Sequence, residues 1–479
     1  MADQELFTGF EDVVAESIQD WHVPGCAVTA MRSNDTLLCH AYGMRDLERA
    51  LPFLTGTLFE IASLTKAFTA ACLGILADRA LIDWDAAVRT YLPGFALHDA
   101  TATDGVTVAD LLSHSTGLPR HDPVWMGRTD MTRQEILESL RWLELSCKPR
   151  TRFQYQTMTY VVAGLTVEAV DGRSWEDFVQ AELLEPLGMS RTRLLRKAGL
   201  ATGDYAMPYR VQDAKPARMG FKSITPALRP AGGIISTAED MGRWLAFQLG
   251  DGSANGRRVL STATLRRLQT PVINVTGDNC PFAGLPEFGD CAYCLGWFSQ
   301  PYRGHRMLHH SGASDGLTSV VLLFPDDHLG VSVLTNSHDT MQRLVPALTV
   351  ADILLGLQPL PWNDRYLERA SRQEAPQSEA SVHTDPGRPL PAYVGTYAHP
   401  AYGQLVVTET AGGLHLELHG PDAEVFGAGA DTFATISGSL LDQGDRVHFS
   451  FDADGRAASV AVPVEHTVSP ILFGRQAAL

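Results

Sequence analysis

Ser63 and Lys66 are the residues whose types and spacing most directly suggest chemistry. They lie three positions apart in Ser63-Leu64-Thr65-Lys66, at the start of an apolar segment that is expected to be helical. On a helix, residues three apart share a face, so the amine of Lys66 can reach Oγ of Ser63. A serine becomes a nucleophile when a base takes its proton, and a neutral lysine can be that base. The pair therefore suggests serine acyl transfer, which an arginine could not support because it stays protonated.

Two further motifs add weight to this pattern, which is short enough to occur by chance. Tyr155, in Phe153-Gln154-Tyr155-Gln156-Thr157, stands where a loop enters an apolar helix. A phenol beside a cationic lysine can shuttle protons. His310 precedes Ser311-Gly312-Ala313 on an expected edge strand. Considered alone, Tyr155 is more simply a core tyrosine and His310 a packed or surface histidine.

The backbone around the third motif suggests how a carbonyl group could be held. Gly312 would let a ligand approach the strand closely. The amide of Ala313, together with the amide of Ser63 at the helix start, would form an oxyanion hole. We expect Thr157, Ser311 and Gly312 to contribute to substrate binding.

Size and charge narrow the possible partners. The chain has 479 residues and a formal net charge of −17, whereas binding to nucleic acid requires a basic surface for the phosphates. We therefore expect neither nucleic acid nor an anionic membrane as a partner. The first residues lack a basic run followed by an apolar core, and no apolar stretch is long enough to span a bilayer, so we expect a cytoplasmic protein.

The cysteines raise the alternative of a metal centre. Seven are scattered along the chain, and Cys291-Ala292-Tyr293-Cys294 has the spacing of a metal-binding pair. This segment is expected to be a strand, on which residues three apart point to opposite faces. No second cysteine pair is present to complete a zinc site. We therefore favour structural cysteines and expect no metal.

The expected elements describe an α+β protein with an antiparallel sheet. Apolar periodicity predicts helices over 4–20 and 63–78, a region of helices and loops over 85–260, and a closing helix over 340–356. Alternating and apolar segments predict a hairpin of 25–31 and 36–42, followed much later by strands over 291–299, 306–310, 317–324 and 329–335.

The chain is expected to contain two domains joined by a linker. Residues 1–365 would form the catalytic domain. Residues 366–389 are polar, poor in aromatic residues and bounded by prolines, which predicts a linker. Residues 390–479 contain short alternating segments at 404–409, 414–419, 447–451 and 459–462, so we expect a separate small β-barrel or sandwich.

The three motifs, in this order, resemble those of the serine β-lactamase and penicillin-binding-protein superfamily. The resemblance is strongest to the class C β-lactamase-like branch, which includes D-alanyl-D-alanine carboxypeptidases, D-aminopeptidases and esterases. Supporting runs are found at 111–119, 185–192 and 229–241, within a likeness that covers about residues 5–357. It implies a β-lactamase-like fold, with an antiparallel sheet flanked by helices and an all-helical region. The tail resembles the lipocalin-like barrel found on some members.

Two positions depart from the family pattern. Thr157 stands where these proteins usually carry an asparagine that bonds the substrate amide and the lysine, which disfavours strict β-lactam turnover. His310 replaces the lysine of the third motif, as is usual in the peptidase and esterase members. This replacement removes a fixed positive charge that would hold a carboxylate.

The resemblance implies a serine hydrolase or acyltransferase acting on peptide-type amides, esters or thioesters, including peptides that contain D-residues. Ser63, Lys66, Tyr155 and His310 would be catalytic, with Lys66 or Tyr155 as the base and His310 bonded to Tyr155 or to the acyl group. No metal or organic cofactor is implied.

Several functions remain open within and beyond this class. Thioesterases of the penicillin-binding-protein type, which macrocyclise nonribosomal peptides, would act on a peptidyl thioester bound to a carrier protein. One alternative is an esterase or β-lactamase-like hydrolase of small molecules. Another is a non-catalytic binding protein on the same fold, which the intact Ser63, Lys66, Tyr155 and His310 disfavour.

Overall fold

The computed structural model describes residues 6–221, 225–338, 341–373 and 384–476. Within them, nine strands form one antiparallel sheet in the order β10-β11-β12-β13-β14-β15-β1-β2-β3. The strands are β1 Gly25–Arg32, β2 Asp35–Asp46, β3 Leu51–Pro52, β10 Ile273–Val275, β11 Cys291–Tyr293, β12 Phe298–Tyr302, β13 His305–Ser314, β14 Leu317–Phe324 and β15 Leu329–Thr335. Strand β1 pairs with β15, so the first and the last strand of this sheet along the chain lie side by side in its interior.

Helices cover both faces of the sheet, which explains why β14 is buried at every position. Alternate residues of a strand point to opposite faces. Val320 and Leu322 therefore join the core beneath α2 (Phe10–Asp20), α14 (Leu344–Leu354) and α15 (Trp362–Gln373), whereas Val321 and Leu323 join the core beneath α3 (Thr65–Asp78) and α12 (Ala238–Leu249). The predicted antiparallel α+β arrangement is confirmed.

Helix α3 lies between the sheet and a helical region, and it is buried along nearly all of its length. The remaining helices are α4 Ala100–Gly105, α5 Val108–Leu112, α6 Arg133–Ser139, α7 Thr157–Asp171, α8 Trp175–Val179, α9 Glu185–Leu187, α10 Arg196–Leu200, α11 Arg229–Gly232 and α13 Thr262–Leu268. Short strand pairs accompany them: β4 Phe59–Glu60 with β7 Ile235–Ser236, β5 Tyr209–Gln212 with β6 Lys215–Arg218, and β8 Ser253–Ala254 with β9 Arg257–Arg258. In the described part of the chain, no helix is both long and apolar enough to cross a membrane.

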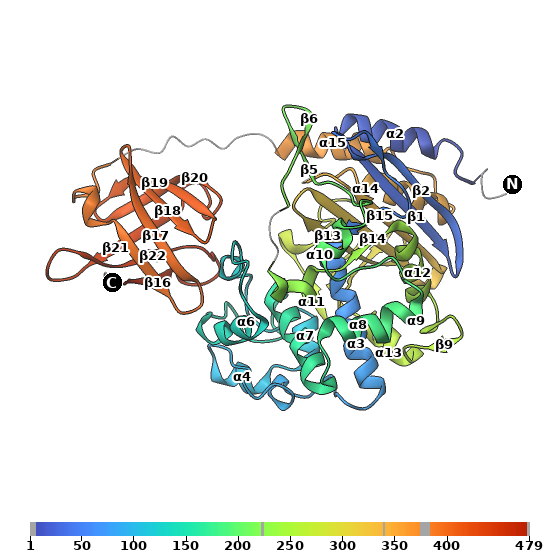
Figure 1. The fold of residues 1–479 in the computed structure, drawn as a ribbon, viewed down its shortest axis with the longest axis horizontal. Coiled ribbons are helices and arrows are strands. Elements are labelled where there is room, and N and C mark those ends of the chain that lie inside the picture. The colour runs from blue at the N-terminus through green and yellow to red at the C-terminus, as the bar shows by residue number, and fades with distance from the viewer. Residues whose placement is uncertain (1–5, 222–224, 339–340, 374–383, 477–479) are drawn as a thin grey trace.

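The tail forms a closed barrel, which decides between the two architectures expected from the sequence. Its strands, all antiparallel, are β16 Gly395–His399, β17 Gly403–Thr410, β18 Gly413–Leu418, β19 Asp422–Gly429, β20 Thr432–Gly438, β21 Arg446–Phe451, β22 Ala457–Val462 and β23 Ile471–Arg475. Strand β16 pairs with β23 and thereby closes the barrel. Inward residues such as Leu416, Phe433 and Phe449 are fully or almost fully buried. Figure 1 shows the barrel beside the helical region, on the side away from the large sheet.

Two elements differ from the sequence prediction. The segment 291–299 is a hairpin of β11 and β12, because the amide of Cys294 bonds the carbonyl of Trp297 at 2.7 Å and Gly296 adopts a φ of +98°. The prediction of a single strand that carries both Cys291 and Cys294 is therefore wrong, although the two are buried free cysteines that lie in different hydrophobic clusters. Helix α15 runs on to Gln373 through part of the segment expected as a linker, because Trp362 and Tyr366 anchor it to the core.

Gly164 provides a test of how tightly the helical region packs. A Cβ at Gly164 in α7 would lie 2.4 Å from Cγ of Pro230 in α11. We expect Gly164→Ala to lower the free energy of unfolding by about 1–3 kcal/mol through overpacking, although alanine usually favours a helix over glycine by about 0.5–1 kcal/mol. Urea unfolding measures the difference.

The matched control is Gly105→Ala at the end of α4, where a Cβ would have no atom within 4 Å. This variant should be neutral or slightly more stable than the wild type. Equal stability of both variants would contradict the tight α7–α11 contact.

Candidate active site

Ser63 lies in a short 3-10 turn, η1 (Ala62–Leu64), directly before α3. Ala62 has a φ of +47°, a left-handed conformation that residues with a Cβ rarely adopt. The turn is held on both sides: the amide of Ile61 donates to the carbonyl of Ile234 at 3.1 Å, and Oγ of Ser319 donates to the carbonyl of Ile61 at 3.1 Å. Ser63 stays half-buried between buried neighbours. A strained backbone fixed by its surroundings at an accessible serine is characteristic of a functional site.

Lys66 is brought into direct contact with Ser63. Its side chain is almost fully buried, and Nζ lies 3.0 Å from Oγ of Ser63 and 3.0 Å from the carbonyl oxygen of Ala231. Among the described residues, no carboxylate pairs with Lys66. Its other close neighbours are aromatic, since Nζ is 4.9 Å from the ring centroid of Tyr155 and 5.5 Å from that of Tyr160.

The segment 229–236 places the carbonyl that Lys66 contacts. The carbonyl of Pro230 accepts from Oγ1 of Thr69 at 2.6 Å, and the amide of Ile234 donates to Oγ1 of Thr65 at 3.1 Å. Both threonines belong to the first turns of α3. The segment 229–236, which belongs to one of the runs that resemble the family, therefore holds the first turns of α3 in place.

Tyr155 lies just before α7, on the other side of Lys66. Its ring packs on His114, with centroids 4.5 Å apart. The flanking residues bind the same histidine: the amide of Gln154 donates to the carbonyl of His114 at 2.9 Å, and the amide of Gln156 donates to its Nδ1 at 3.1 Å. Within the described residues, the Tyr155 hydroxyl makes no hydrogen bond. The phenol is thus fixed through its ring and its backbone.

Strand β13 carries the third motif past the Ser63 turn. A Cβ at Gly312 would lie 2.1 Å from the carbonyl oxygen of Ile61, so the close approach expected at this glycine is made by the protein's own backbone. Ala313 is exposed and Ser311 half-buried beside it. Gly312 thereby sets Ala313 next to η1. The pairing of the Ala313 and Ser63 amides as an oxyanion hole stays a prediction.

His310 differs from its expected role as a hydrogen-bond partner of Tyr155 or of an acyl group. Its Nδ1 lies 2.7 Å from the carbonyl oxygen of Ser311, so Nδ1 carries the proton, and Nε2 accepts from the Tyr293 hydroxyl at 3.1 Å. Both ring nitrogens are therefore engaged. Burial, and then the charge of Lys66, lower the pKa of His310 to about 3. The buried ring of His310 lies 6.1 Å from that of Tyr155, and its part in catalysis stays a prediction.

Thr157 is the first residue of α7, two positions after Tyr155, and is half-buried. Its hydroxyl makes no hydrogen bond within the described ranges, and neither does that of Ser311. Their contribution to substrate binding stays a prediction.

Sequence reasoning assigned no role to His114, Tyr293 or Arg120. His114 is fully buried at a φ of +57°, and burial, followed by the charge of Lys66, lowers its pKa well below the usual range. Tyr293 anchors His310, as described above. The guanidinium carbon of Arg120 lies 5.4 Å from the Tyr155 ring centroid. The run 111–119 was a usable signal for His114, but the position of Arg120 depends on tertiary contacts.

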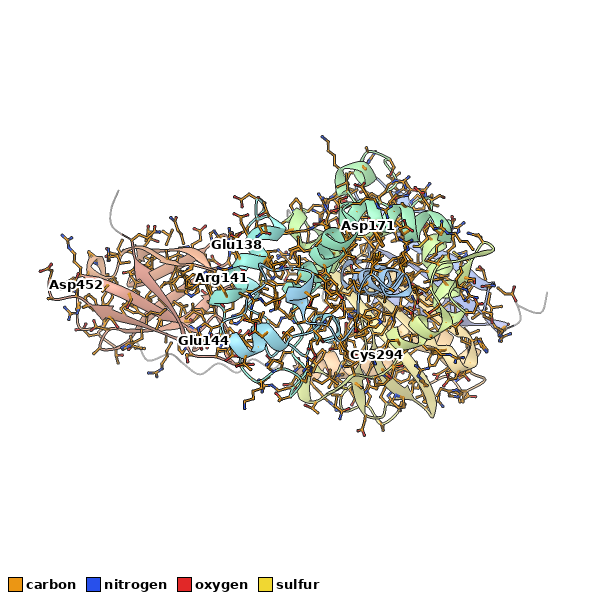
Figure 2. All side chains as sticks on the ribbon, turned by 90° about the horizontal axis from the view of Figure 1, so that it is seen from below. Glu138, Arg141, Glu144, Asp171, Cys294 and Asp452 are labelled. Carbon is orange, nitrogen blue, oxygen red and sulfur yellow. The ribbon has the colours of Figure 1, made fainter. Side chains whose placement is uncertain are left out.

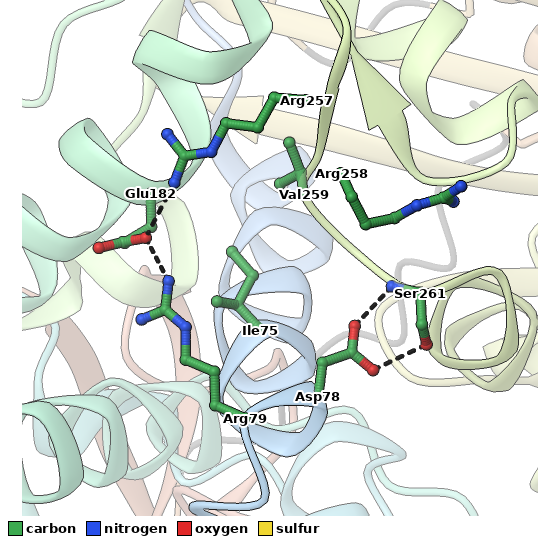
Figure 3. A pocket seen from close by; sticks show the side chains of 8 residues that line it. All are labelled: Ile75, Asp78, Arg79, Glu182, Arg257, Arg258, Val259 and Ser261. Carbon is green, nitrogen blue, oxygen red and sulfur yellow. Dashed lines mark hydrogen bonds and ion pairs between the residues drawn. The ribbon is translucent and has the colours of Figure 1, made fainter.

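A separate pocket of about 290 Å³ opens at the far end of α3, around Asp78 and Arg79 (Figure 3). Its charged groups are largely paired with one another. Arg79 and Arg257 both contact Glu182, and Asp78 accepts from Ser261. It contains none of the residues around Ser63.

Comparison with known proteins finds similarity along most of the chain. A family model described as Beta-lactamase matches residues 10–355, and one described as a domain of unknown function (DUF3471) matches residues 379–474. Unguisins hydrolase ungD' of Aspergillus campestris is 30% identical over 83% of this chain and 77% of its own. Unguisins hydrolase ungD of Aspergillus violaceofuscus is 29% identical over 96% of this chain and 85% of its own.

Solved structures show the same fold. The octameric penicillin-binding protein homologue from Pyrococcus abyssi has a TM-score of 0.64 at 22% identity and covers 95% of this chain and 97% of its own. The class C beta lactamase from Rhodobacter sphaeroides has a TM-score of 0.57 at 20% identity and covers 73% of this chain and 99% of its own.

Buried neutral histidines behind the site should make the fold acid-sensitive. Burial lowers the pKa of both His309 and His310 to about 3. Below about pH 6.5 the unfolded chain therefore binds protons that the folded chain does not, and stability falls as the pH drops towards 3. Each histidine contributes at most about 1.4 kcal/mol per pH unit.

The variant His309→Gln tests this, because it removes one such group. We expect the dependence of unfolding free energy on pH to flatten by up to about 1.4 kcal/mol per unit between about pH 6 and 4, measured by urea unfolding. An unaltered slope in His309→Gln would count against a buried neutral His309.

Proposed function

The chain belongs to the β-lactamase family of serine hydrolases, and from its geometry we propose that Ser63 is the nucleophile of a peptide-directed acyl-transfer reaction. The observation that carries this proposal is the 3.0 Å contact between Oγ of Ser63 and the buried amine of Lys66. The names of the two unguisins hydrolases support hydrolysis as the reaction, and the resemblance to peptidases of this superfamily suggests peptides as the substrate class.

Lys66 is the proposed base. The carbonyl of Ala231 can only accept, so it binds one N–H of Lys66. When the amine is neutral, its lone pair is then available to the proton of Ser63. As that proton moves to Nζ, Oγ of Ser63 bonds to the substrate carbonyl carbon and the carbonyl oxygen becomes an oxyanion. The amides of Ser63 and Ala313 are the proposed donors to it.

Tyr155 is the proposed proton donor to the leaving group. Its ring lies against Lys66, and in the described structure its hydroxyl has no protein partner that would compete with substrate. Proton transfer from Lys66 through this phenol to the leaving atom would break the acyl bond and restore the neutral amine. The acyl-serine then passes to water, or to an amine of the same peptide in a cyclising enzyme. His310 supports the site by packing and does not transfer protons, since both its nitrogens are engaged.

Removing Ser63 tests the nucleophile. We expect Ser63→Ala to abolish labelling by a fluorophosphonate, measured as intact mass, with the melting temperature close to that of the wild type. Ser115→Ala is a matched control, because Ser115 is buried and its hydroxyl donates to Asp110 at 3.0 Å rather than contacting Lys66; this variant should still be labelled. Appreciable labelling or turnover in Ser63→Ala would rule out the mechanism.

Removing the phenol tests proton transfer. Tyr155→Phe keeps the ring contacts with Lys66 and His114, so stability should stay near wild type while kcat falls by about 10²–10⁴-fold. A panel of p-nitrophenyl esters, D-amino-acid amides and linear peptidyl thioesters is the assay. Cyclic product from a thioester would select the cyclase, and turnover confined to small esters would favour the small-molecule esterase. A kcat within about two-fold of wild type would exclude Tyr155 as the proton donor.

A further inference from the structure

The barrel contacts the active-site region through loop 118–125. His121 in this loop is fully buried at a φ of +45°. Its Nδ1 lies 2.6 Å from the Tyr402 hydroxyl of the barrel, and its Nε2 lies 3.0 Å from the carbonyl oxygen of Glu144. The carbonyl only accepts, so Nε2 carries the proton and Nδ1 accepts from Tyr402. The amide of His121 also donates to Glu465 of the barrel at 3.2 Å.

The same loop is bound to the residue beside Tyr155. The side-chain amide of Gln156 donates to the carbonyls of Pro119 and Arg120, the latter at 2.9 Å. Its side-chain oxygen meanwhile caps α7 by accepting from Met158 at 2.7 Å. Arg120 is thus held between two anchors, Gln156 on the catalytic side and His121 on the barrel side.

Apolar packing reinforces this junction. Leu118 and Val124 of the loop and Tyr402 of the barrel are fully buried in one continuous hydrophobic cluster. Glu144, whose carbonyl binds His121, follows Glu138 of α6 and Arg141 of the next 3-10 turn (Leu140–Trp142). Figure 2 shows these residues between the barrel and the rest of the chain. The barrel therefore helps to determine where the backbone of Arg120 lies.

The side chain of Arg120 is oriented by one hydrogen bond, and the rest of its guanidinium has no hydrogen-bond partner among the described residues. Its Nε donates to Oδ2 of Asp122 at 2.8 Å, and its side chain is 58% exposed whereas that of Asp122 is 17% exposed. No other hydrogen bond or ion pair of this guanidinium is present within the described residues. The two terminal nitrogens are therefore free, beside the ring of Tyr155.

A guanidinium fork with free terminal nitrogens matches a carboxylate in two parallel hydrogen bonds. At the third motif, the neutral His310 stands where the family pattern has a lysine, so this part of the site carries no cation. We propose that Arg120 is the specificity residue that binds a substrate carboxylate, aimed by Asp122 and by the barrel's hold on His121. This inference rests on the proposed function, since it concerns substrates that react at Ser63.

The test compares matched thioester substrates that differ only in charge. One pair has mercaptoacetate or mercaptoacetamide as the leaving group of N-acetyl-D-alanine. The other has a free or an amidated succinyl cap on the acyl side. We expect the wild type to prefer the acid in one pair by about ten-fold or more in kcat/KM, which also identifies the side on which the carboxylate lies.

Arg120→Gln should remove that preference, lowering kcat/KM for the acid by about ten-fold or more while changing the amide by less than about two-fold. Arg120→Lys, which keeps the charge and loses the fork, should restore only part of it. Arg141→Gln is the charge-matched control, at an exposed residue that makes no ion pair in the described structure, and should keep the full preference.

The role of the barrel is tested by Tyr402→Phe, which removes the hydrogen bond to His121. We expect it to lower the preference for the acid by about three-fold or more with little effect on the amide. Tyr397→Phe is the matched control, since the buried hydroxyl of Tyr397 donates to the carbonyl of Tyr393 within the barrel; it should leave the preference unchanged.

Distinct results would overturn each part of the inference. The carboxylate site would be excluded if the wild type had equal kcat/KM for acid and amide in both pairs. It would also be excluded if Arg120→Gln lowered kcat/KM similarly for both substrates. In either case Ser63 would still react with fluorophosphonate. An unchanged preference in Tyr402→Phe would exclude the barrel's part. Failure of Ser63 to react with any probe would overturn the proposed function, and this inference with it.

Discussion

The contact between the Lys66 amine and the Ser63 hydroxyl is the constraint around which this structure is organised. A buried amine needs hydrogen-bond acceptors, and an acidic neighbour would fix it as a cation. The fold meets the first need with the carbonyl of Ala231, and no carboxylate among the described residues pairs with Lys66. Aromatic faces of Tyr155 and Tyr160 complete its surroundings. Because α3 is buried nearly along its whole length, this environment requires packing from the sheet on one side and the helical region on the other.

Three distant segments must meet for the site to exist. The Ser63 turn is held by Ile234 and Ser319, and Gly312 lets β13 pass against the backbone of Ile61. The loop before α7 places Tyr155 beside Lys66. Each is a close polar or steric fit, so small displacements of β13 or α11 would reach the reacting atoms. The left-handed backbone at Ala62 persists because both flanks of the turn are fixed.

The barrel extends this dependence beyond the catalytic domain. Its Tyr402 and Glu465 bind His121, while Gln156 binds the two residues before His121 on the catalytic side. Contacts of this kind, made through a buried and neutral imidazole, are directional and leave little freedom to the intervening Arg120. The barrel is therefore physically continuous with the wall of the site, through one shared hydrophobic cluster.

The sequence by itself determined the fold class through its apolar periodicity and the pairing of Ser63 with Lys66 through their spacing. It indicated the family through the resemblance of its three motifs. It also predicted an all-β tail, and the resemblance implied the barrel that the pairing of β16 with β23 confirms. Only the tertiary structure decided that the ring of His310 is hydrogen-bonded to Ser311 and Tyr293. It also decided that β13 passes against the backbone of Ile61 at Gly312, and that 291–299 is a hairpin. It alone revealed His114 beneath Tyr155 and the position of Arg120. These features arise from contacts between residues far apart in the chain, and local spacing carries no information about which distant surfaces will meet.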